Sequence, residues 1–243
     1  MIPKVIHYCW FGRQVKPQLV IDYIEVWHRV LSDYEIKEWN EDNFNVDSLP
    51  YTAQAYKAKK YAFVSDVCRM YALLEGGIYL DTDVRVLRTF NNFLKNKSFI
   101  GIEARNRLGT AVIGAEPDTP WIKDFLQEYN SIPFQKGNGK FDLLPNTTRL
   151  TSFLSQYGGE QPEIYAQDFF SAKDYKSGTV SITDNTVCVH DFSSSWVGIP
   201  RYEIIEKRFW KMLGMKNLNI LNKFKWLPKK ILSSYKIVLG LLG

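Results

Sequence analysis

The stretch YAFVSDVCRMYALLEGGIYLDTDVRV, residues 61–86, decides how this chain folds. Its first half places apolar residues at helical spacing on one face: Phe63, Val67, Met70 and Leu74. Gly76 follows at the position where a left-handed glycine commonly ends a helix. An apolar strand then runs into two acidic residues, Asp81 and Asp83. Because carboxylates are rare in buried strands, this pair calls for a chemical reason.

The rest of the chain alternates between strand-like and helix-like stretches. Residues 4–11 form a nearly continuous apolar run, typical of a strand covered on both faces. Further strands are expected in YEIKEWN, GGIYLDTDVRVL, SFIGIEA, TAVIGA, TVSIT and TVCVHDF. Helices are expected in PQLVIDYIEVWHRVL, over residues 51–75 and 90–95, and in PWIKDFLQEYN and TRLTSFLSQYG, with a loop over 131–140. This alternation predicts an α/β fold, a single mostly parallel central sheet flanked by helices.

Composition divides the chain into a body and a basic tail. Of the 31 lysines and arginines nine follow Glu206, where no acidic residue remains, so residues 1–206 carry 22 basic against 26 acidic groups. We expect one domain over residues 1–215 and a basic amphipathic tail over 216–243. The three cysteines lack C-x-x-C spacing, and no secretory leader or membrane-spanning run is seen. These features favour the cytoplasm.

Three polar residues share one arc of the helix expected before Gly76, opposite its apolar face. They are Ser65, Asp66 and Arg69, flanked by the small residues Ala62 and Ala72. One interpretation is a solvated face with an i, i+3 Asp–Arg pair. The other is a ligand contact, for which the two alanines leave room.

The aspartates have the spacing of a metal site. In an extended strand Asp81 and Asp83 point to one face, with Cα atoms roughly 6.6 Å apart. Two ionised carboxylates this close repel each other unless a cation lies between them, and carboxylate oxygens suit Mn²⁺ or Mg²⁺. Alternatively, the pair caps backbone groups at a strand end. A metal-dependent phosphohydrolase also uses such a pair, whereas a glycosidase needs carboxylates on opposite sides of the scissile bond.

Three blocks, in this order, resemble glycosyltransferase family 32: IPKVIHYCWFG, SDVCRMYALLEGGIYLDTDV and VHDFSSSW. The family includes fungal initiating mannosyltransferases and bacterial capsule transferases, and is more distantly similar to the glucosylating domains of large clostridial toxins. The resemblance covers residues 2 to about 196. It implies a GT-A-like fold and a retaining transfer of a sugar from a UDP- or GDP-linked donor. The acceptor would be a glycan or lipid-linked saccharide, in capsule or cell-surface polysaccharide synthesis.

The same resemblance implies roles for individual residues. Asp66, Arg69, Asp81 and Asp83 would be catalytic, and the donor would contact Trp10, Ser65, Asp66, Arg69, Asp81, Ser195 and Trp196. Asp81, Asp83 and His190 would bind the Mn²⁺ (or Mg²⁺). The family often has a second histidine or aromatic after the first, but this chain has Asp191, so either His190 or Asp191 is the third protein ligand. Trp10 in an apolar strand is equally typical of a core residue, and His190 of a structural histidine.

The tail KNLNILNKFKWLPKKILSSYKIVLGLL interleaves lysines with large apolar residues. This pattern favours an anionic membrane surface over nucleic acid, so we expect the tail to attach a cytoplasmic protein to the inner face of the cell membrane. The alternative is a helix packed on the body. Three functions remain open: the glycosyltransferase, the phosphohydrolase, and a non-catalytic sugar- or lipid-binding module.

Overall fold

The computed structural model describes residues 1–105 and 107–192. The basic tail and the predicted donor contacts Ser195 and Trp196 lie outside the described residues, so those expectations remain predictions.

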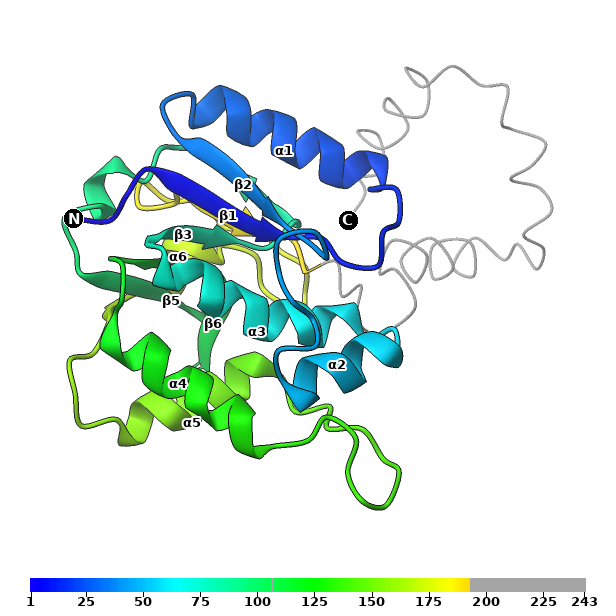
Figure 1. The fold of residues 1–243 in the computed structure, drawn as a ribbon. Coiled ribbons are helices and arrows are strands. Elements are labelled where there is room, and N and C mark those ends of the chain that lie inside the picture. The colour runs from blue at the N-terminus through cyan, green and yellow to red at the C-terminus, as the bar shows by residue number, and fades with distance from the viewer. Residues whose placement is uncertain (106, 193–243) are drawn as a thin grey trace, which may run out of the picture. The chain divides into compact units, whose positions relative to one another are not determined.

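A six-stranded sheet forms the centre of the described chain (Figure 1). Its order is β2-β1-β3-β6-β5-β7, and the strands are β1 (Val5–Cys9), β2 (Glu35–Trp39), β3 (Gly77–Leu80), β5 (Ser98–Ala104), β6 (Arg107–Ala115) and β7 (Glu163–Tyr165). β1 pairs in parallel with β2 and β3, and β5 pairs in parallel with β7. β6 is antiparallel to both of its neighbours. The predicted α/β fold with a mostly parallel sheet is confirmed.

Helices cover both faces of this sheet, as Figure 1 shows. α1 (Gln18–Val30) lies on one face, where Trp27 is fully buried in a core with the apolar side chains of β1 and β3. The other face carries α2 (Pro50–Lys57), α3 (Tyr61–Leu74), α4 (Pro120–Ser131) and α5 (Asn146–Gln156). The apolar face of α3, including Phe63, Val67 and Met70, lies in this second core. β1 and β3 therefore have core on both faces, which is why they read as continuous apolar runs.

The two glycines after α3 let the chain turn sharply and pass close to β1. Gly76 has φ +79° and Gly77 has φ +132°, both in the region that disfavours a side chain. A Cβ on Gly77 would lie 2.7 Å from the Val5 carbonyl oxygen and 2.8 Å from His7 Nε2. The chain can therefore turn from the helix into β3, directly against β1, only with glycine here.

Several boundaries differ from the sequence-based expectations. The helix expected over 51–75 is two helices, because Lys59 adopts φ +56° and its N–H bonds to the Tyr56 carbonyl, which closes α2. The expected strand 179–183 has only an isolated bridge, from Val180 to Lys173. β7 and the short helix α6 (Gln167–Phe170) were not expected. The 90–95 piece contains a single 3₁₀ turn, η1 (Asn91–Phe93).

The strand expected to contain both aspartates is divided. β3 ends at Leu80, the Asp81 N–H bonds to the Ala111 carbonyl, and the Val84 N–H bonds to the Asp81 carbonyl. Asp81–Val84 is thus a tight turn, and the chain re-enters as β4 (Val84–Val86). β4 pairs antiparallel with β8 (Cys188–His190) in a separate two-stranded sheet. The expectation that both aspartates stand on one extended strand is wrong: a turn brings them together instead.

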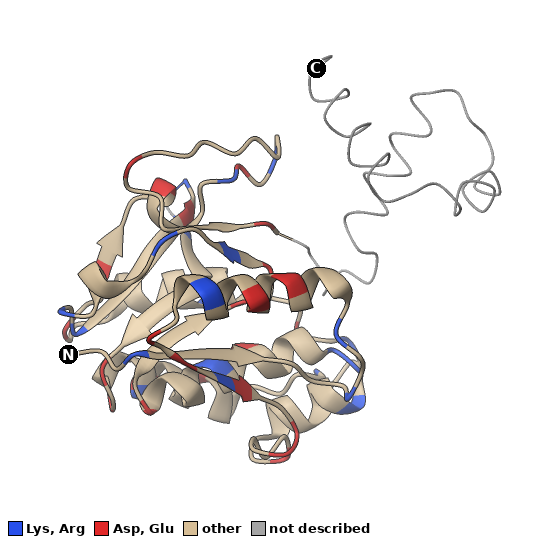
Figure 2. Ribbon diagram, turned by 90° about the horizontal axis from the view of Figure 1, so that it is seen from above, with Lys and Arg blue, Asp and Glu red and all other residues tan. Residues whose placement is uncertain are grey.

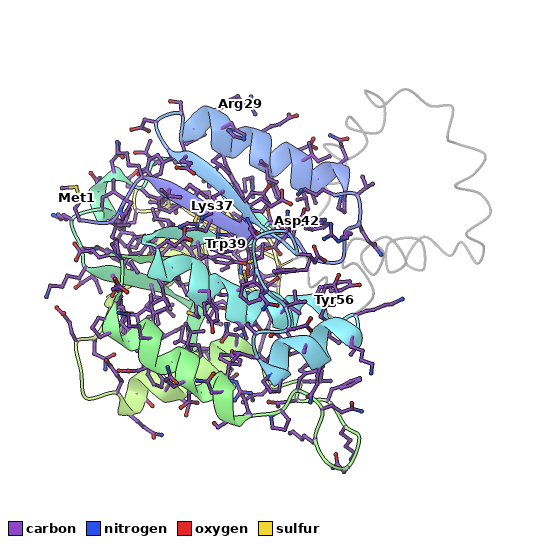
Figure 3. All side chains as sticks on the ribbon, viewed as in Figure 1. Met1, Arg29, Lys37, Trp39, Asp42 and Tyr56 are labelled. Atoms are coloured by element: carbon purple, nitrogen blue, oxygen red, sulfur yellow. The ribbon has the colours of Figure 1, made fainter. Side chains whose placement is uncertain are left out.

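His7 is a structural residue of the sheet. Its Nε2 lies 3.0 Å from the Gly76 carbonyl oxygen, and its Nδ1 accepts a hydrogen bond of 3.1 Å from Trp39 Nε1. Figure 3 labels Trp39 beside Lys37 on β2, where the lysine ammonium lies 4.5 Å from the indole ring centre. Burial lowers the pKa of His7, so the ring is neutral and donates from Nε2.

Charged residues of both signs are interspersed over the described body, for example along α1 (Figure 2). Cys9, Cys68 and Cys188 are buried free thiols, as their apolar surroundings in the sequence predict. None of the helices in residues 1–105 and 107–192 has the length and apolar character needed to cross a bilayer.

Candidate active site

Asp81, Asp83 and His190 come together although more than 100 residues separate the histidine from the aspartates. One potential ligand atom from each lies within 4.8 Å of the other two. β8 makes this possible, because its pairing with β4 places His190 opposite Val84, next to the Asp81–Val84 turn. His190 Nε2 lies 3.3 Å from Asp83 Oδ1. Two carboxylates and one imidazole form a donor set that suits a divalent cation.

Asp191 has a different role from its neighbour. Its carboxylate accepts a 2.6 Å hydrogen bond from the Tyr23 hydroxyl and a 3.0 Å bond from the Lys173 ammonium. Arg85 Nε lies 3.4 Å from the same carboxylate. Its backbone N–H also donates to the Asp83 carbonyl oxygen at 2.9 Å. The side chain is therefore committed to neutralising partners, while the backbone fixes the aspartate turn.

The charges of Asp81, Asp83 and His190 compensate one another. Burial disfavours the charged His190 ring, but the carboxylates of Asp83, Asp81 and Glu103 outweigh this and raise its pKa to about 9. At neutral pH a proton on His190 thus supplies the positive charge that the carboxylates require. Its Nδ1 is buried and has no hydrogen-bond partner among the described residues. A cation that binds here must displace that proton.

Arg69 fixes the aspartate turn from the helix. Arg69 is only 4% exposed, and its guanidinium carbon lies 4.7 Å from the centre of the Tyr79 ring. It donates to the Thr110 carbonyl oxygen at 2.6 Å and to Asp66 Oδ1 at 2.9 Å, and it lies 3.4 Å from Asp81 Oδ1. The Tyr79 hydroxyl donates to the same Asp81 oxygen at 2.9 Å. The Asp–Arg pair is therefore not a solvated face, because Arg69 is buried and its guanidinium also contacts Asp81.

The Asp66 carboxylate on α3 is costly to ionise. Burial raises its pKa to about 6, more than the attraction of Arg69 lowers it, and the nearby charge of Asp81 adds to the rise. Its side chain keeps 14% exposure. An acid that is costly to ionise and still accessible is typical of a ligand-binding position.

A cavity of about 570 Å³ connects these residues. Its lining includes Ser65, Asp66, Asp81, Asp83 and His190. Trp10, which follows β1, also lines it and is partly exposed, with its indole N–H bonded to the Gln14 carbonyl oxygen at 2.7 Å. Trp10 is therefore not a fully buried core residue. The structure places every described residue predicted for the site at this one cavity.

Two buried polar residues that line the cavity, Glu103 and Asn146, are not among the residues predicted from the sequence. Glu103 on β5 is 6% exposed, burial raises the pKa of its carboxyl, and Arg107 bonds to it at 3.1 Å. The sequence does contain a signal for Glu103, since SFIGIEA is another apolar strand that contains a carboxylate. Asn146 begins α5, accepts a hydrogen bond from Tyr129, and is 4% exposed. No local pattern distinguishes it from an ordinary helix-start asparagine.

Part of this sequence matches a known protein family and a curated protein. Residues 17–100 match the family described as a glycosyltransferase sugar-binding region containing a DXD motif. A curated relative, inositol phosphoceramide mannosyltransferase 3 of Schizosaccharomyces pombe, is 26% identical over 148 residues, 59% of this chain. The aligned part spans about 40% of that relative's length.

The fold is also found among solved structures. The PaToxG glycosyltransferase superposes with a TM-score of 0.53 at 20% identity, over 64% of this chain and 68% of that one. This likeness supports the GT-A-like fold expected from the sequence. The DXD-containing region, the curated relative and the fold together confirm the expected resemblance to glycosyltransferase family 32.

Proposed function

We propose that this protein transfers a sugar, with retention of anomeric configuration, from a UDP- or GDP-linked donor to a glycan or lipid-linked saccharide. The observation that carries the proposal is the convergence of Asp81, Asp83 and His190 at the wall of a cavity of about 570 Å³. That volume lies within the range of about 300–1,000 Å³ typical of small-molecule sites. The pathway we assign to it is capsule or cell-surface polysaccharide synthesis, as the resemblance implies.

Mn²⁺ or Mg²⁺ is the proposed cofactor, held by Asp81, Asp83 and His190. The residues fit it, because their donors are hard oxygens and an imidazole, and because the site without a cation has to carry a proton on His190. When bound, such an ion neutralises charge on the leaving diphosphate. His190, rather than Asp191, is the proposed third ligand, since Tyr23 and Lys173 occupy the Asp191 carboxylate.

The remaining residues bind and orient the donor in this proposal. Trp10 lines the cavity, and its indole is the proposed stacking partner of the nucleotide base. Asp66 and Ser65 face the same space, where the carboxylate accepts hydrogen bonds from sugar hydroxyls. Arg69 is a positioning residue, because its guanidinium is spent on Asp66, Asp81 and the backbone of Thr110.

The relative's name guides the choice of substrates. It is a mannosyltransferase that acts on a ceramide lipid, so mannose-bearing donors and lipid-linked acceptors come first in a screen. The phosphohydrolase alternative is less well supported. Arg69 and Tyr79 hold one oxygen of Asp81, which suits a fixed ligand better than an attacking nucleophile.

The test compares two carboxylates that are close in space and differ in partners. Wild type, Asp83→Asn and Asp191→Asn are assayed for nucleotide-sugar consumption with and without Mn²⁺, and for phosphate release from a simple monoester. We expect Asp83→Asn to lose at least about a hundredfold in metal-dependent turnover and Asp191→Asn to stay within about tenfold of wild type. Monoester hydrolysis by the wild type, or no turnover with any donor, would refute the proposal.

A further inference from the structure

The mouth of the cavity has an unusual distribution of charge. Residues 48–65 contain no acidic residue, and residues 129–159 contain only Asp142. Asp142 is 8% exposed, and Arg149 donates to it at 2.6 Å. Five lysines stand on these segments, and we call them the lysine rim: Lys57, Lys59, Lys60, Lys136 and Lys140. These two segments therefore carry five lysines and, in Asp142, a single acid that is buried and paired.

The two segments belong to one surface. The Gln135 N–H donates to Gln54 Oε1 at 2.8 Å, which ties the segment after α4 to α2. Phe134 packs beneath, with ring centres 5.4 Å from Tyr51 and 5.1 Å from Phe63. Figure 1 shows the segment after α4 projecting beside α2.

The lysine rim has fewer ion-pair partners than Lys37, Lys97 and Lys123 elsewhere on the body. Lys37 and Lys123 form ion pairs with Glu75 and Asp118, and Lys97 pairs with Glu160. Within the part of the chain that the structure describes, Lys57, Lys59, Lys60 and Lys140 form no ion pair, and Lys136 reaches Asp142 only at 3.6 Å. A cationic face that lacks its own counter-ions is suited to an anionic partner.

Exposed apolar side chains accompany this charge and indicate which anion. We call them the apolar tip: Phe141, Leu143 and Leu144, which are 37%, 51% and 41% exposed. They follow Lys140 directly, and Leu143 lines the cavity together with Lys59 and Lys60. A soluble polyanion would use the lysines alone, whereas the boundary of a bilayer also takes up apolar side chains.

We propose that the lysine rim and the apolar tip dock the body of this enzyme on an anionic membrane, with the mouth of the cavity facing the lipid. None of its residues belongs to the basic tail, residues 216–243. It would bring a lipid-linked acceptor to Asp81 and Asp83 without removing it from the bilayer. The inference goes beyond the proposed reaction and holds for any donor sugar.

The experiment measures co-sedimentation of the full chain with vesicles of phosphatidylcholine and phosphatidylglycerol, and with pure phosphatidylcholine vesicles. The test variant is Lys57→Gln/Lys136→Gln/Lys140→Gln, which leaves the cavity-lining lysines intact. The matched control is Lys37→Gln/Lys97→Gln/Lys123→Gln, with the same loss of charge elsewhere on the body. Each rim lysine is expected to contribute about fivefold to partitioning, so the test variant should bind the anionic vesicles about a hundredfold more weakly.

The control is expected to bind these vesicles within about threefold of wild type. Wild-type binding by the test variant, equal losses in both triple variants, or no vesicle binding by the wild type would overturn the proposal. A second pair of substitutions tests the apolar tip. Phe141→Ser/Leu144→Ser should weaken anionic-vesicle binding and leave binding to the soluble polyanion dextran sulfate unchanged. Binding of the wild type to dextran sulfate but not to vesicles would assign the face to a soluble polyanion instead.

Discussion

At the residue scale, the site depends on how the protein stabilises closely spaced carboxylates. Asp81 is held by Arg69 and the Tyr79 hydroxyl, and Asp83 by contact with His190. Asp66 shares Arg69 with Asp81. One buried guanidinium therefore serves two acids, which leaves a local excess of negative charge.

Arg69 should be essential for stability as well as activity. Arg69→Ala leaves the largely buried Asp66 without its cation and removes a contact of the partly exposed Asp81, so we expect the unfolding free energy to fall by about 3–5 kcal/mol. Arg69→Lys keeps the charge but loses the forked geometry, so its loss should be smaller. Urea unfolding monitored by circular dichroism measures both. A loss below about 1 kcal/mol for Arg69→Ala would contradict the bracing role.

Asp66 should reduce stability at neutral pH. Its folded-state pKa of about 6 lies above the unfolded value of 3.8, so the folded state holds the proton more tightly, and stability falls as pH rises from about 4 to 6. Asp66→Asn carries no titrating group and avoids this loss. We expect the metal-free variant to be more stable than wild type by about 1–3 kcal/mol at pH 7.5, with no gain below pH 4.

Thermal melts of the two proteins across this pH range give the comparison. An advantage of Asp66→Asn that is constant with pH, or present only at low pH, would mean that the Asp66 carboxylate does not titrate in this way.

Sequence reasoning identified those candidate site residues that stand out in a local pattern. Asp81 and Asp83 stand out as carboxylates beside a buried strand, and Ser65, Asp66 and Arg69 as a polar arc on an apolar helix. The choice between His190 and Asp191 could not be made, because it depends on Tyr23 and Lys173, which are distant in sequence. Tertiary contacts of this kind leave no periodic signal.

At the element scale, two features shape the site: the glycine turn into β3 and the pairing of β4 with β8. The glycine turn sets β3 directly against β1. The β4–β8 pairing brings in His190 from the far end of the described chain. Helix and strand types were predictable from apolar spacing, as β1, α1 and α3 show. The break at Asp81 was not, because β3 and β4 join through a turn that lacks glycine and proline.

Gly77 should tolerate no side chain. In Gly77→Ala the new Cβ meets the Val5 carbonyl and the His7 ring at a φ of +132°, so we expect a loss of about 3 kcal/mol. That corresponds to a melting temperature lower by roughly 5–10 °C. Gly158→Ala is the matched control, since a Cβ there meets nothing within 4 Å and φ is not positive. Equal melting temperatures for the two variants would contradict the packing argument.

At the scale of the whole molecule, one cavity is lined by the site residues, by Lys59 and Lys60 of the lysine rim, and by Leu143 of the apolar tip. The charge division visible in the sequence concerned only the tail. The second basic surface is not visible there, because it combines segments about 80 residues apart that meet through Gln54 and Gln135.

Metal and nucleotide should stabilise the folded protein together. A ligand that binds only the folded state adds about 2.7 kcal/mol at a hundred times its dissociation constant. We therefore expect Mn²⁺ with UDP or GDP to raise the melting temperature of the wild type by roughly 5–10 °C, and that of His190→Ala by much less. The same shift in both proteins would remove His190 from the site.

The most direct measurement of the central claim is anomalous diffraction at the manganese edge, from crystals soaked with Mn²⁺ and a nucleoside diphosphate. The account predicts one strong peak in bonding contact with Asp81, Asp83 and His190, with the diphosphate beside it. A peak elsewhere on the protein, or none at this cluster in crystals that contain the nucleotide, would contradict it.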